Sequence, residues 1–146
     1  MKRVLFLCTH NSARSQMAEG LLRSMAGDRF EAHSAGTEMS RVHPLAIASM
    51  REVGVDISGQ HSKSLDDFVA QSFETVITVC DHAAETCPVF PNAKRRIHWS
   101  FEDPSGARGT EQERLDKFHE IRDKITAHLQ TFIDEEDRRG RLSSED

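Results

Sequence analysis

Short apolar runs alternate along the chain with longer segments whose apolar residues recur at helical spacing. The apolar runs predict strands at residues 4–7, 30–34, 75–79 and 97–100. Helices are predicted at residues 14–27, 44–54 and, more briefly, 64–71, and a last helix from Thr110 onward. Parallel strands need crossover connections, so this alternation predicts a parallel sheet. We therefore expect one α/β domain, a four-stranded parallel sheet flanked by helices on both faces.

The last predicted helix begins at the capping box Thr110-Glu111-Gln112-Glu113. It carries an apolar stripe that should pack on the sheet, made of Leu115, Phe118, Ile121, Ile125, Leu129 and Phe132. Beyond Asp134 the sequence has mixed charges without apolar residues to anchor it. We therefore assign residues 1–135 to the domain and residues 136–146 to a solvated, partly disordered tail.

Composition limits the partners that the chain is expected to have. With 146 residues and 37% hydrophobic content, it suits one compact domain. A formal net charge of −5 argues against nucleic-acid and anionic membrane surfaces, because these require a basic field. No apolar run approaches the roughly 18 residues of a membrane span, and the N-terminus has no signal-type region. We expect a cytoplasmic monomer with no nucleic-acid or membrane partner.

Cys8 follows the first predicted strand, and Arg14 opens the first predicted helix. The loop between them must turn sharply with unpaired backbone N–H groups, which suit an oxyanion. Arg14 can hold two oxygens of a tetrahedral anion, and Asn11 suits a positive φ. The positive end of the helix, the N–H groups and the Ser15 hydroxyl are expected to lower the pKa of Cys8. The predicted oxyanion site is Thr9, His10, Asn11, Ser12, Ala13, Arg14 and Ser15. A buried cysteine beside a solvated arginine is the alternative.

The chain has three cysteines, an arrangement unlike a secreted disulfide framework. Cys8 and Cys80 both follow predicted strands, and ligands of parallel sheets bind at the carboxyl ends of strands. Inert thiols are the alternative for Cys80 and Cys87. A zinc set drawn from the cysteines with His10 and His82 is a further alternative, but the spacings differ from those of fingers and ribbons. We therefore predict no metal site.

The sequence of residues 8–15, Cys-Thr-His-Asn-Ser-Ala-Arg-Ser, resembles the catalytic loop of the low-molecular-weight tyrosine phosphatase superfamily. Asp103-Pro104 strengthens the resemblance, because that family places such a pair late in the chain. The resemblance implies that Cys8 is the nucleophile and that Asp103, rather than Glu102, protonates the leaving oxygen. Tyrosine is absent, and residues 105–107 are Ser-Gly-Ala where phosphatases place aromatic residues. A small inorganic anion therefore fits better than a tyrosine ring.

Together with the loop and the acid, Cys80 and Cys87 resemble the thioredoxin-coupled arsenate reductases of the same superfamily. The resemblance implies that Cys8 attacks arsenate, that Cys80 attacks Cys8 with release of arsenite, and that Cys87 attacks Cys80. The implied Cys80–Cys87 disulfide is reduced by thioredoxin, with glutaredoxin and glutathione as the alternative, and the implied function is arsenic detoxification. We expect a helical turn between Cys80 and Cys87 in the reduced form and rearrangement on oxidation.

Many relatives of the thioredoxin-coupled type hold a potassium ion with asparagine, glutamate, serine and aspartate. Asn11, Glu19 and Ser34 match the first three, whereas Lys63 stands at the aspartate position. We expect no tightly bound cofactor and hypothesise that the Lys63 ammonium replaces potassium. A solvated Lys63, with Asp66 supplying the carboxylate, is the alternative.

Two functions of other classes remain open. A tyrosine or small-substrate phosphatase would turn over aryl phosphate without a reductant. A non-catalytic oxyanion-binding or redox-sensing module would be stabilised by anions without consuming electrons in the presence of arsenate. His43, His98 and His128 are interpreted as surface or core-edge residues rather than ligands.

Overall fold

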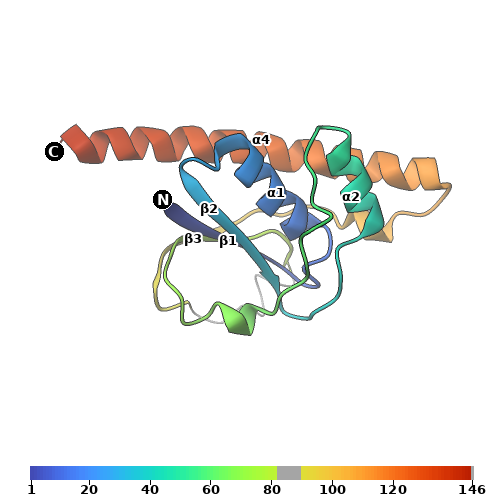
Figure 1. The fold of residues 1–146 in the computed structure, drawn as a ribbon, viewed down its shortest axis with the longest axis horizontal. Helices are drawn as coiled ribbons and strands as arrows, with labels where there is room; N and C mark the ends of the chain where they lie inside the picture. The colour runs from blue at the N-terminus through green and yellow to red at the C-terminus, as the bar shows by residue number, and fades with distance from the viewer. Residues whose placement is uncertain (82–89, 146) are drawn as a thin grey trace.

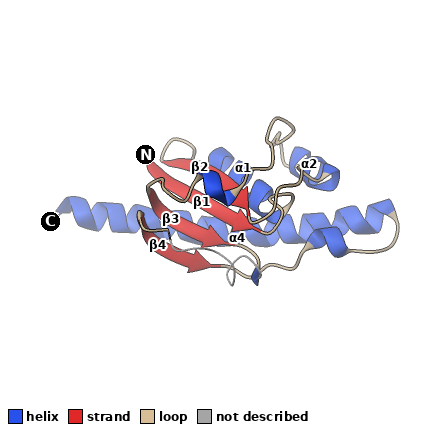
Figure 2. Ribbon diagram, turned by 90° about the horizontal axis from the view of Figure 1, so that it is seen from below, coloured by secondary structure: helices blue, strands red, loops and turns tan. Residues whose placement is uncertain are grey.

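The computed structural model describes residues 1–81 and 90–145, with side chains as far as residue 140. In this part of the chain four parallel strands form one sheet in the order β2-β1-β3-β4 (Figure 2). The strands are β1 (Lys2–Cys8), β2 (Phe30–Gly36), β3 (Phe73–Thr78) and β4 (Ala93–His98). The predicted α/β fold class is confirmed, although β4 lies earlier in the chain than predicted.

The helices are α1 (Arg14–Ala26), α2 (Pro44–Arg51) and α4 (Glu111–Glu145). In Figure 1, α1 and α4 lie above the sheet and α2 packs against α4 beside them. The described α-helices lie on this side of the sheet, and a connecting segment around residues 64–71 lies on the other. In that segment the Phe68 ring lies 5.7 Å from the His33 ring and 6.1 Å from the Phe73 ring.

The predicted helix at residues 64–71 was wrong. This segment contains only the 3-10 turn η1 (Leu65–Asp67). The Ser64 hydroxyl accepts the Asp66 N–H at 3.2 Å and caps the turn, and the backbone leaves helical hydrogen bonding soon after it. The second helix also ends earlier than predicted, at Arg51.

The interior of the domain is formed by β1 and by the predicted stripe of α4. Val4, Leu5, Phe6 and Leu7 are fully buried in the middle of the sheet. The stripe is confirmed, since Phe118, Ile121, Ile125 and Leu129 are fully buried and Phe132 nearly so. Each such side chain contributes about 1.5–3 kcal/mol by leaving water. None of the described helices combines the length and the apolar character that crossing a bilayer requires.

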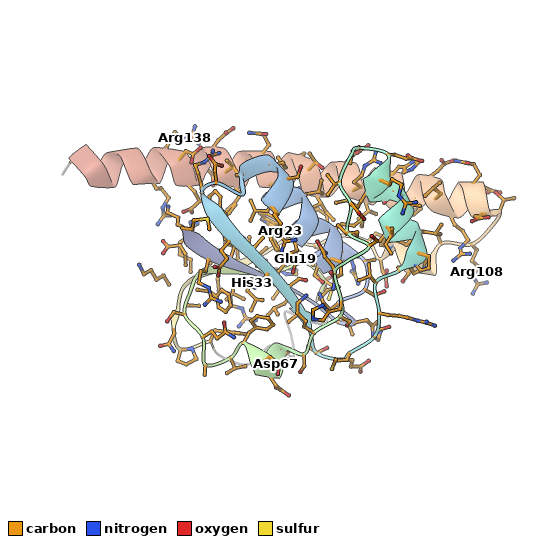
Figure 3. The ribbon with its side chains drawn as sticks, in the orientation of Figure 1. Glu19, Arg23, His33, Asp67, Arg108 and Arg138 are labelled. Atoms are coloured by element: carbon orange, nitrogen blue, oxygen red, sulfur yellow. The ribbon has the colours of Figure 1, made fainter. Side chains whose placement is uncertain are left out.

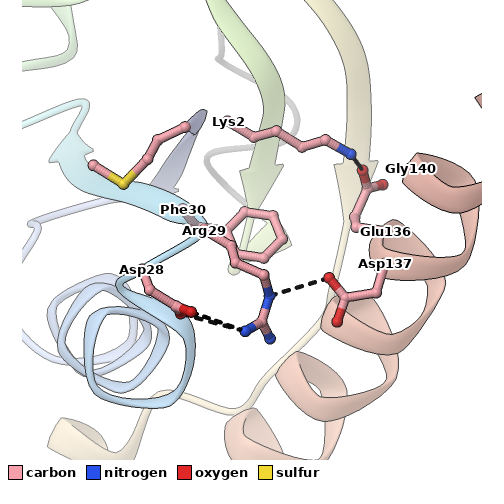
Figure 4. A pocket seen from close by; sticks show the side chains of 8 residues that line it. Lys2, Asp28, Arg29, Phe30, Glu136, Asp137 and Gly140 are labelled. Atoms are coloured by element: carbon pink, nitrogen blue, oxygen red, sulfur yellow. Dashed lines mark hydrogen bonds and ion pairs between the residues drawn. The ribbon is translucent and has the colours of Figure 1, made fainter. Parts of the chain in front are cut away.

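The C-terminal part of α4 differs from the predicted disordered tail. The helix passes the expected boundary at residue 135 without interruption and continues to Glu145. Glu136 is 2% exposed and accepts hydrogen bonds from Lys2, at 3.0 Å, and from Arg95. Figure 4 shows Asp137 paired with Arg29 beside a cavity of about 690 Å³. Cations from the sheet thus hold a helical turn that has no apolar residues of its own.

Candidate active site

Two cysteines meet at the carboxyl edge of the sheet. β1 ends at Cys8, and the neighbouring strand β3 continues into Val79, whose N–H binds Leu7 O at 2.8 Å. This pairing brings Cys80 beside Cys8, where the two buried thiols are hydrogen-bonded. Thr9 Oγ1 lies 3.3 Å from Cys80 Sγ. Cys87, the third predicted cysteine, lies outside the described residues, as does the turn predicted between Cys80 and Cys87.

The pKa of Cys8 is not lowered in this arrangement, contrary to the expectation from sequence. The hydrogen bond with Cys80 and burial of the sulfur raise the pKa of Cys8 far above its ordinary value. The charge of Arg14 and the Thr9 N–H act in the opposite direction but are outweighed. The Ser15 hydroxyl, expected to help Cys8, accepts a hydrogen bond from Asn11 Nδ2 at 2.9 Å. The two adjacent thiols therefore favour the protonated form of Cys8.

The carbonyl groups of the loop after β1 are taken up by residues outside it. Thr37 N binds Cys8 O, Glu38 N binds Thr9 O, Ser62 Oγ binds His10 O, Gln16 Nε2 binds Asn11 O, and His43 N binds Ser12 O. The C=O and N–H of a peptide unit point in opposite directions, so the N–H groups face the other way. The loop thereby presents donors to the space that it encloses.

Asn11 is the residue around which the loop turns. It has the predicted positive φ, 50°, and is fully buried. Its side-chain oxygen accepts hydrogen bonds from Gln16 Nε2 and from the Lys63 backbone N–H, both at 2.8 Å. These bonds tie the loop to α1 and to the segment after α2, so Asn11 supports the loop.

Arg14 combines burial with an unused donor. Its Nη1 donates to Phe101 O at 2.9 Å, and its Nη2 lies 3.6 Å from Asp103 Oδ2. Its Nε is buried and has no hydrogen-bond partner in the described part of the chain. Ala13, at the N-cap of α1, offers no side-chain acceptor to the first turn. Donors from the guanidinium and from the helix start are thus available to an anion.

Asp103, rather than Glu102, faces the loop. Ser105 donates to Asp103 Oδ1 from its backbone N, at 3.0 Å, and from its hydroxyl, at 2.7 Å. Burial acts to raise the pKa of Asp103, but the Ser105 bonds and the charges of Arg14 and His10 outweigh it, and the pKa is lowered. Glu102 instead pairs with Lys117 on α4 at 2.6 Å.

The mouth of the loop opens into a pocket of about 200 Å³. Its lining residues are Cys8, His10, Ser12, Ala13, Arg14, Ser40, His43, Asp103 and Ser105. None of these described residues is Phe or Trp, and the rings among them are the imidazoles of His10 and His43. Sequence reasoning missed His43, which caps α2 by accepting the Leu45 N–H at 3.0 Å. Its place before Pro44 at a helix start was the available signal.

The four residues matched to a cation site lie close together beside the loop. The Glu19 carboxylate is buried on α1 (Figure 3). Its Oε1 accepts from Ser34 Oγ at 2.9 Å and lies 3.5 Å from Lys63 Nζ. The Lys63 ammonium also donates to His61 O at 2.9 Å. Arg23 pairs with the other carboxylate oxygen of Glu19 at 3.3 Å. Among the described residues, no group of three or more His, Cys, Asp and Glu side chains could hold a metal ion, but His82 and Cys87 of the zinc alternative fall outside them.

Gly36, the last residue of β2, leaves the space that the loop occupies. A Cβ at this position would lie 2.8 Å from both Asn11 N and Thr9 O. Because both atoms belong to backbone, Gly36→Ala should lower the free energy of unfolding by about 1–3 kcal/mol. It should also weaken stabilisation by phosphate, measured as the shift of the melting temperature. Gly59→Ala is the control, since nothing lies within 4 Å of its added Cβ. Equal stability of the two variants would show that the loop does not depend on this close approach.

Comparison with known proteins agrees with this geometry. A family model described as low molecular weight phosphotyrosine protein phosphatase matches residues 3–142. An arsenate reductase of Halalkalibacterium halodurans is 44% identical over 133 residues, covering 91% of this chain and 96% of that protein.

Solved structures give the same grouping. An arsenate reductase in the phosphate binding state is 37% identical, with a TM-score of 0.81 over 92% of this chain and 98% of that one. A thioredoxin-dependent arsenate reductase of Corynebacterium glutamicum is 34% identical, with a TM-score of 0.66 over 90% of this chain and 61% of that one. The chain therefore belongs to the low molecular weight phosphotyrosine protein phosphatase family, and within it groups with the arsenate reductases.

Proposed function

We propose that the protein reduces arsenate to arsenite by a three-cysteine relay that thioredoxin regenerates. The observation that carries the proposal is the interaction of two buried thiols, Cys8 at the start of the oxyanion loop and Cys80 beside it. A phosphatase needs the first thiol and the loop, whereas reduction of the bound anion needs a second thiol within reach of the first. The similarity to arsenate reductases supports the same substrate.

The first step joins arsenate to Cys8. The Cys8 thiol passes its proton to the Asp103 carboxylate, and the sulfur attacks arsenic. An As–O bond breaks, and the arsenate hydroxyl takes that proton from Asp103 and leaves as water. Arg14 and the loop N–H groups hold the remaining oxygens. Arsenic is still in its pentavalent state in this adduct.

The second step transfers two electrons. The Cys80 thiolate attacks the Cys8 sulfur, the S–S bond forms and the S–As bond breaks. The electron pair of the broken bond stays on arsenic, which leaves as arsenite. The Cys87 thiolate then attacks the Cys80 sulfur and releases Cys8 as a thiolate. The dithiol of thioredoxin reduces the resulting Cys80–Cys87 disulfide, and the thioredoxin dependence of the similar Corynebacterium glutamicum enzyme supports this partner.

The test is arsenate-dependent oxidation of NADPH with thioredoxin and its reductase, run beside glutaredoxin and glutathione. We expect activity with the thioredoxin system. Activity only with glutaredoxin and glutathione would change the partner, and no activity in either system would overturn the function. Turnover of aryl phosphate without any reductant would favour the phosphatase alternative, for which the described pocket provides no Phe or Trp side chain.

We propose further that the Lys63 ammonium stands in place of a potassium ion at Glu19. It lies 3.5 Å from Glu19 Oε1, where a second cation would meet like-charge repulsion. The donor set also includes the Ser34 hydroxyl, which already donates to the same carboxylate oxygen. The residues present therefore do not fit an additional potassium ion.

Arsenate turnover should accordingly be the same in potassium chloride and in sodium chloride at equal ionic strength. Lys63→Asp should create a dependence on potassium, because it removes the ammonium and adds a carboxylate oxygen ligand. Lys63→Met, which removes the charge without adding a ligand, is the matched control. If potassium activated the parent protein several-fold over sodium, the proposal that the Lys63 ammonium replaces potassium would be refuted.

A further inference from the structure

One imidazole joins the residues on either side of Cys80. His98, the last residue of β4, has Nδ1 at 2.7 Å from Thr78 Oγ1 and Nε2 at 2.8 Å from Asp81 Oδ1. Thr78 is the last residue of β3, and Asp81 directly follows Cys80. The short segment that carries Cys80 is therefore held from both ends by a side chain of the neighbouring strand.

The chemistry of the side chains determines which atom donates in the His98–Asp81 hydrogen bond. The Asp81 carboxylate can only accept, so His98 Nε2 carries a proton and donates. Hydrogen bonds from His98 and from the Ser100 side chain lower the pKa of Asp81 and keep it ionised. Because Asp81 is exposed, the pair contributes little to global stability, and its effect is on position.

The backbone before Cys80 is also fixed. Val79 N donates to Leu7 O, and Trp99 N donates to Thr78 O, both at 2.8 Å. Between these bonds and Asp81, Cys80 is 3% exposed and directs its sulfur toward Thr9 and Cys8. Of the bonds named here, the Asp81–His98 hydrogen bond is the one that holds a residue following Cys80 in the sequence.

We propose that Asp81 and His98 are positioning residues that hold the Cys80 sulfur for its attack on Cys8. This inference rests on the proposed relay, because attack by Cys80 forms the Cys8–Cys80 disulfide and expels arsenite. Proximity accelerates such a step only if the sulfur stays in place. Loss of the Asp81 anchor should slow disulfide formation and leave anion binding by the Arg14 loop unchanged.

The test uses Cys87→Ser as the parent, so that the reaction stops at the Cys8–Cys80 disulfide. After mixing with arsenate, quenching and alkylation, mass spectrometry follows this disulfide with time. Asp81→Ala should slow its formation by roughly tenfold at saturating arsenate. Asp81→Asn, which keeps an oxygen acceptor for His98, should restore most of the rate. Asp67→Ala removes an exposed acid on η1 and is the control.

The arsenate concentration at half-maximal rate should be the same in all these variants. The positioning role would be overturned if Asp81→Ala formed the disulfide as fast as its parent. It would also be overturned if Asp81→Asn formed it no faster than Asp81→Ala. A weakened affinity for arsenate in Asp81→Ala would overturn it as well, by placing the effect on binding. If the Cys87→Ser parent itself forms no Cys8–Cys80 disulfide, the relay fails and the proposal fails with it.

Discussion

Cys80→Ala should abolish arsenate turnover and, at the same time, lower the pKa of Cys8. Without Cys80 no adjacent thiol attacks the Cys8 adduct, so arsenite is not released and electrons are not consumed. The second effect has a separate cause. The hydrogen bond that the Cys8 thiol donates to Cys80 is the largest contribution that raises the pKa of Cys8, and a negative charge on Cys80 acts in the same direction. Both disappear in the variant, whereas the lowering by Arg14 and the Thr9 N–H remains.

The pKa is best measured in proteins that differ only at residue 80. The chain has three cysteines, so Cys80→Ala/Cys87→Ala leaves Cys8 as a single thiol that can be titrated without ambiguity. Cys87→Ala, which keeps the Cys8–Cys80 contact, is the reference. Thiolate absorbance and the rate of alkylation by iodoacetamide should both rise at lower pH in the double variant.

Phosphate-dependent thermal stabilisation should persist in both proteins, because Arg14 and the loop are unchanged. This control separates loss of Cys80 from damage to the pocket. An unchanged or higher pKa of Cys8 in the double variant would show that burial, rather than contact with Cys80, keeps the thiol protonated. Continued arsenate turnover by Cys80→Ala would exclude Cys80 from the relay.

The anion loop could be predicted from sequence because its determinants are contiguous. Residues 8–15 follow one apolar strand and begin one helix, so local pattern was enough to place Cys8, Arg14 and the positive φ of Asn11. Asp103 was placed by family resemblance, since a turn before a helix has the same local pattern. Its two bonds from Ser105 are those of an ordinary capping aspartate.

Features that depend on distant residues could not be predicted in this way. The pKa of the Cys8 thiol is raised chiefly by Cys80, which lies beside Cys8 because β1 and β3 are neighbours in the sheet. Likewise, the charged sequence after Asp134 gives no sign that Lys2 and Arg95 will hold Glu136 in a buried position. Local charge pattern predicts a solvated segment, and long-range pairing overrides it.

The mistaken helix at residues 64–71 has a different cause. Leu65 and Phe68 are both buried, and apolar residues three positions apart are expected on one face of a helix of any length. Their spacing therefore does not distinguish a single turn from a longer helix. The Ser64 cap is present in either case. The segment ends after one turn because Phe68 packs against His33 and Phe73 of the sheet, which the sequence alone does not reveal.

Asp103→Asn should lower arsenate turnover by about 10²–10⁴-fold, the usual contribution of a general acid. Asparagine can accept the same hydrogen bonds from Ser105, so the turn and the folded stability should be preserved. Glu102→Gln is the matched control, because Glu102 pairs with Lys117 and does not line the pocket. Equal losses in the two variants would contradict the assignment of Asp103 as the acid.

The pH profile gives the sharper form of this prediction. The pKa of Asp103 is lowered, so its carboxylate is ionised at neutral pH before an anion binds. Both proteins need the Cys8 thiolate, so the ratio of the parent rate to the Asp103→Asn rate isolates the acid, and this ratio should rise as pH falls. A bound arsenate dianion opposes the charge of Arg14 and raises the pKa of Asp103. Because kcat/KM reports the free enzyme and kcat the complex, the ratio of kcat values should begin to rise at higher pH than the ratio of kcat/KM values. Ratios that do not change with pH would show that another group is the acid.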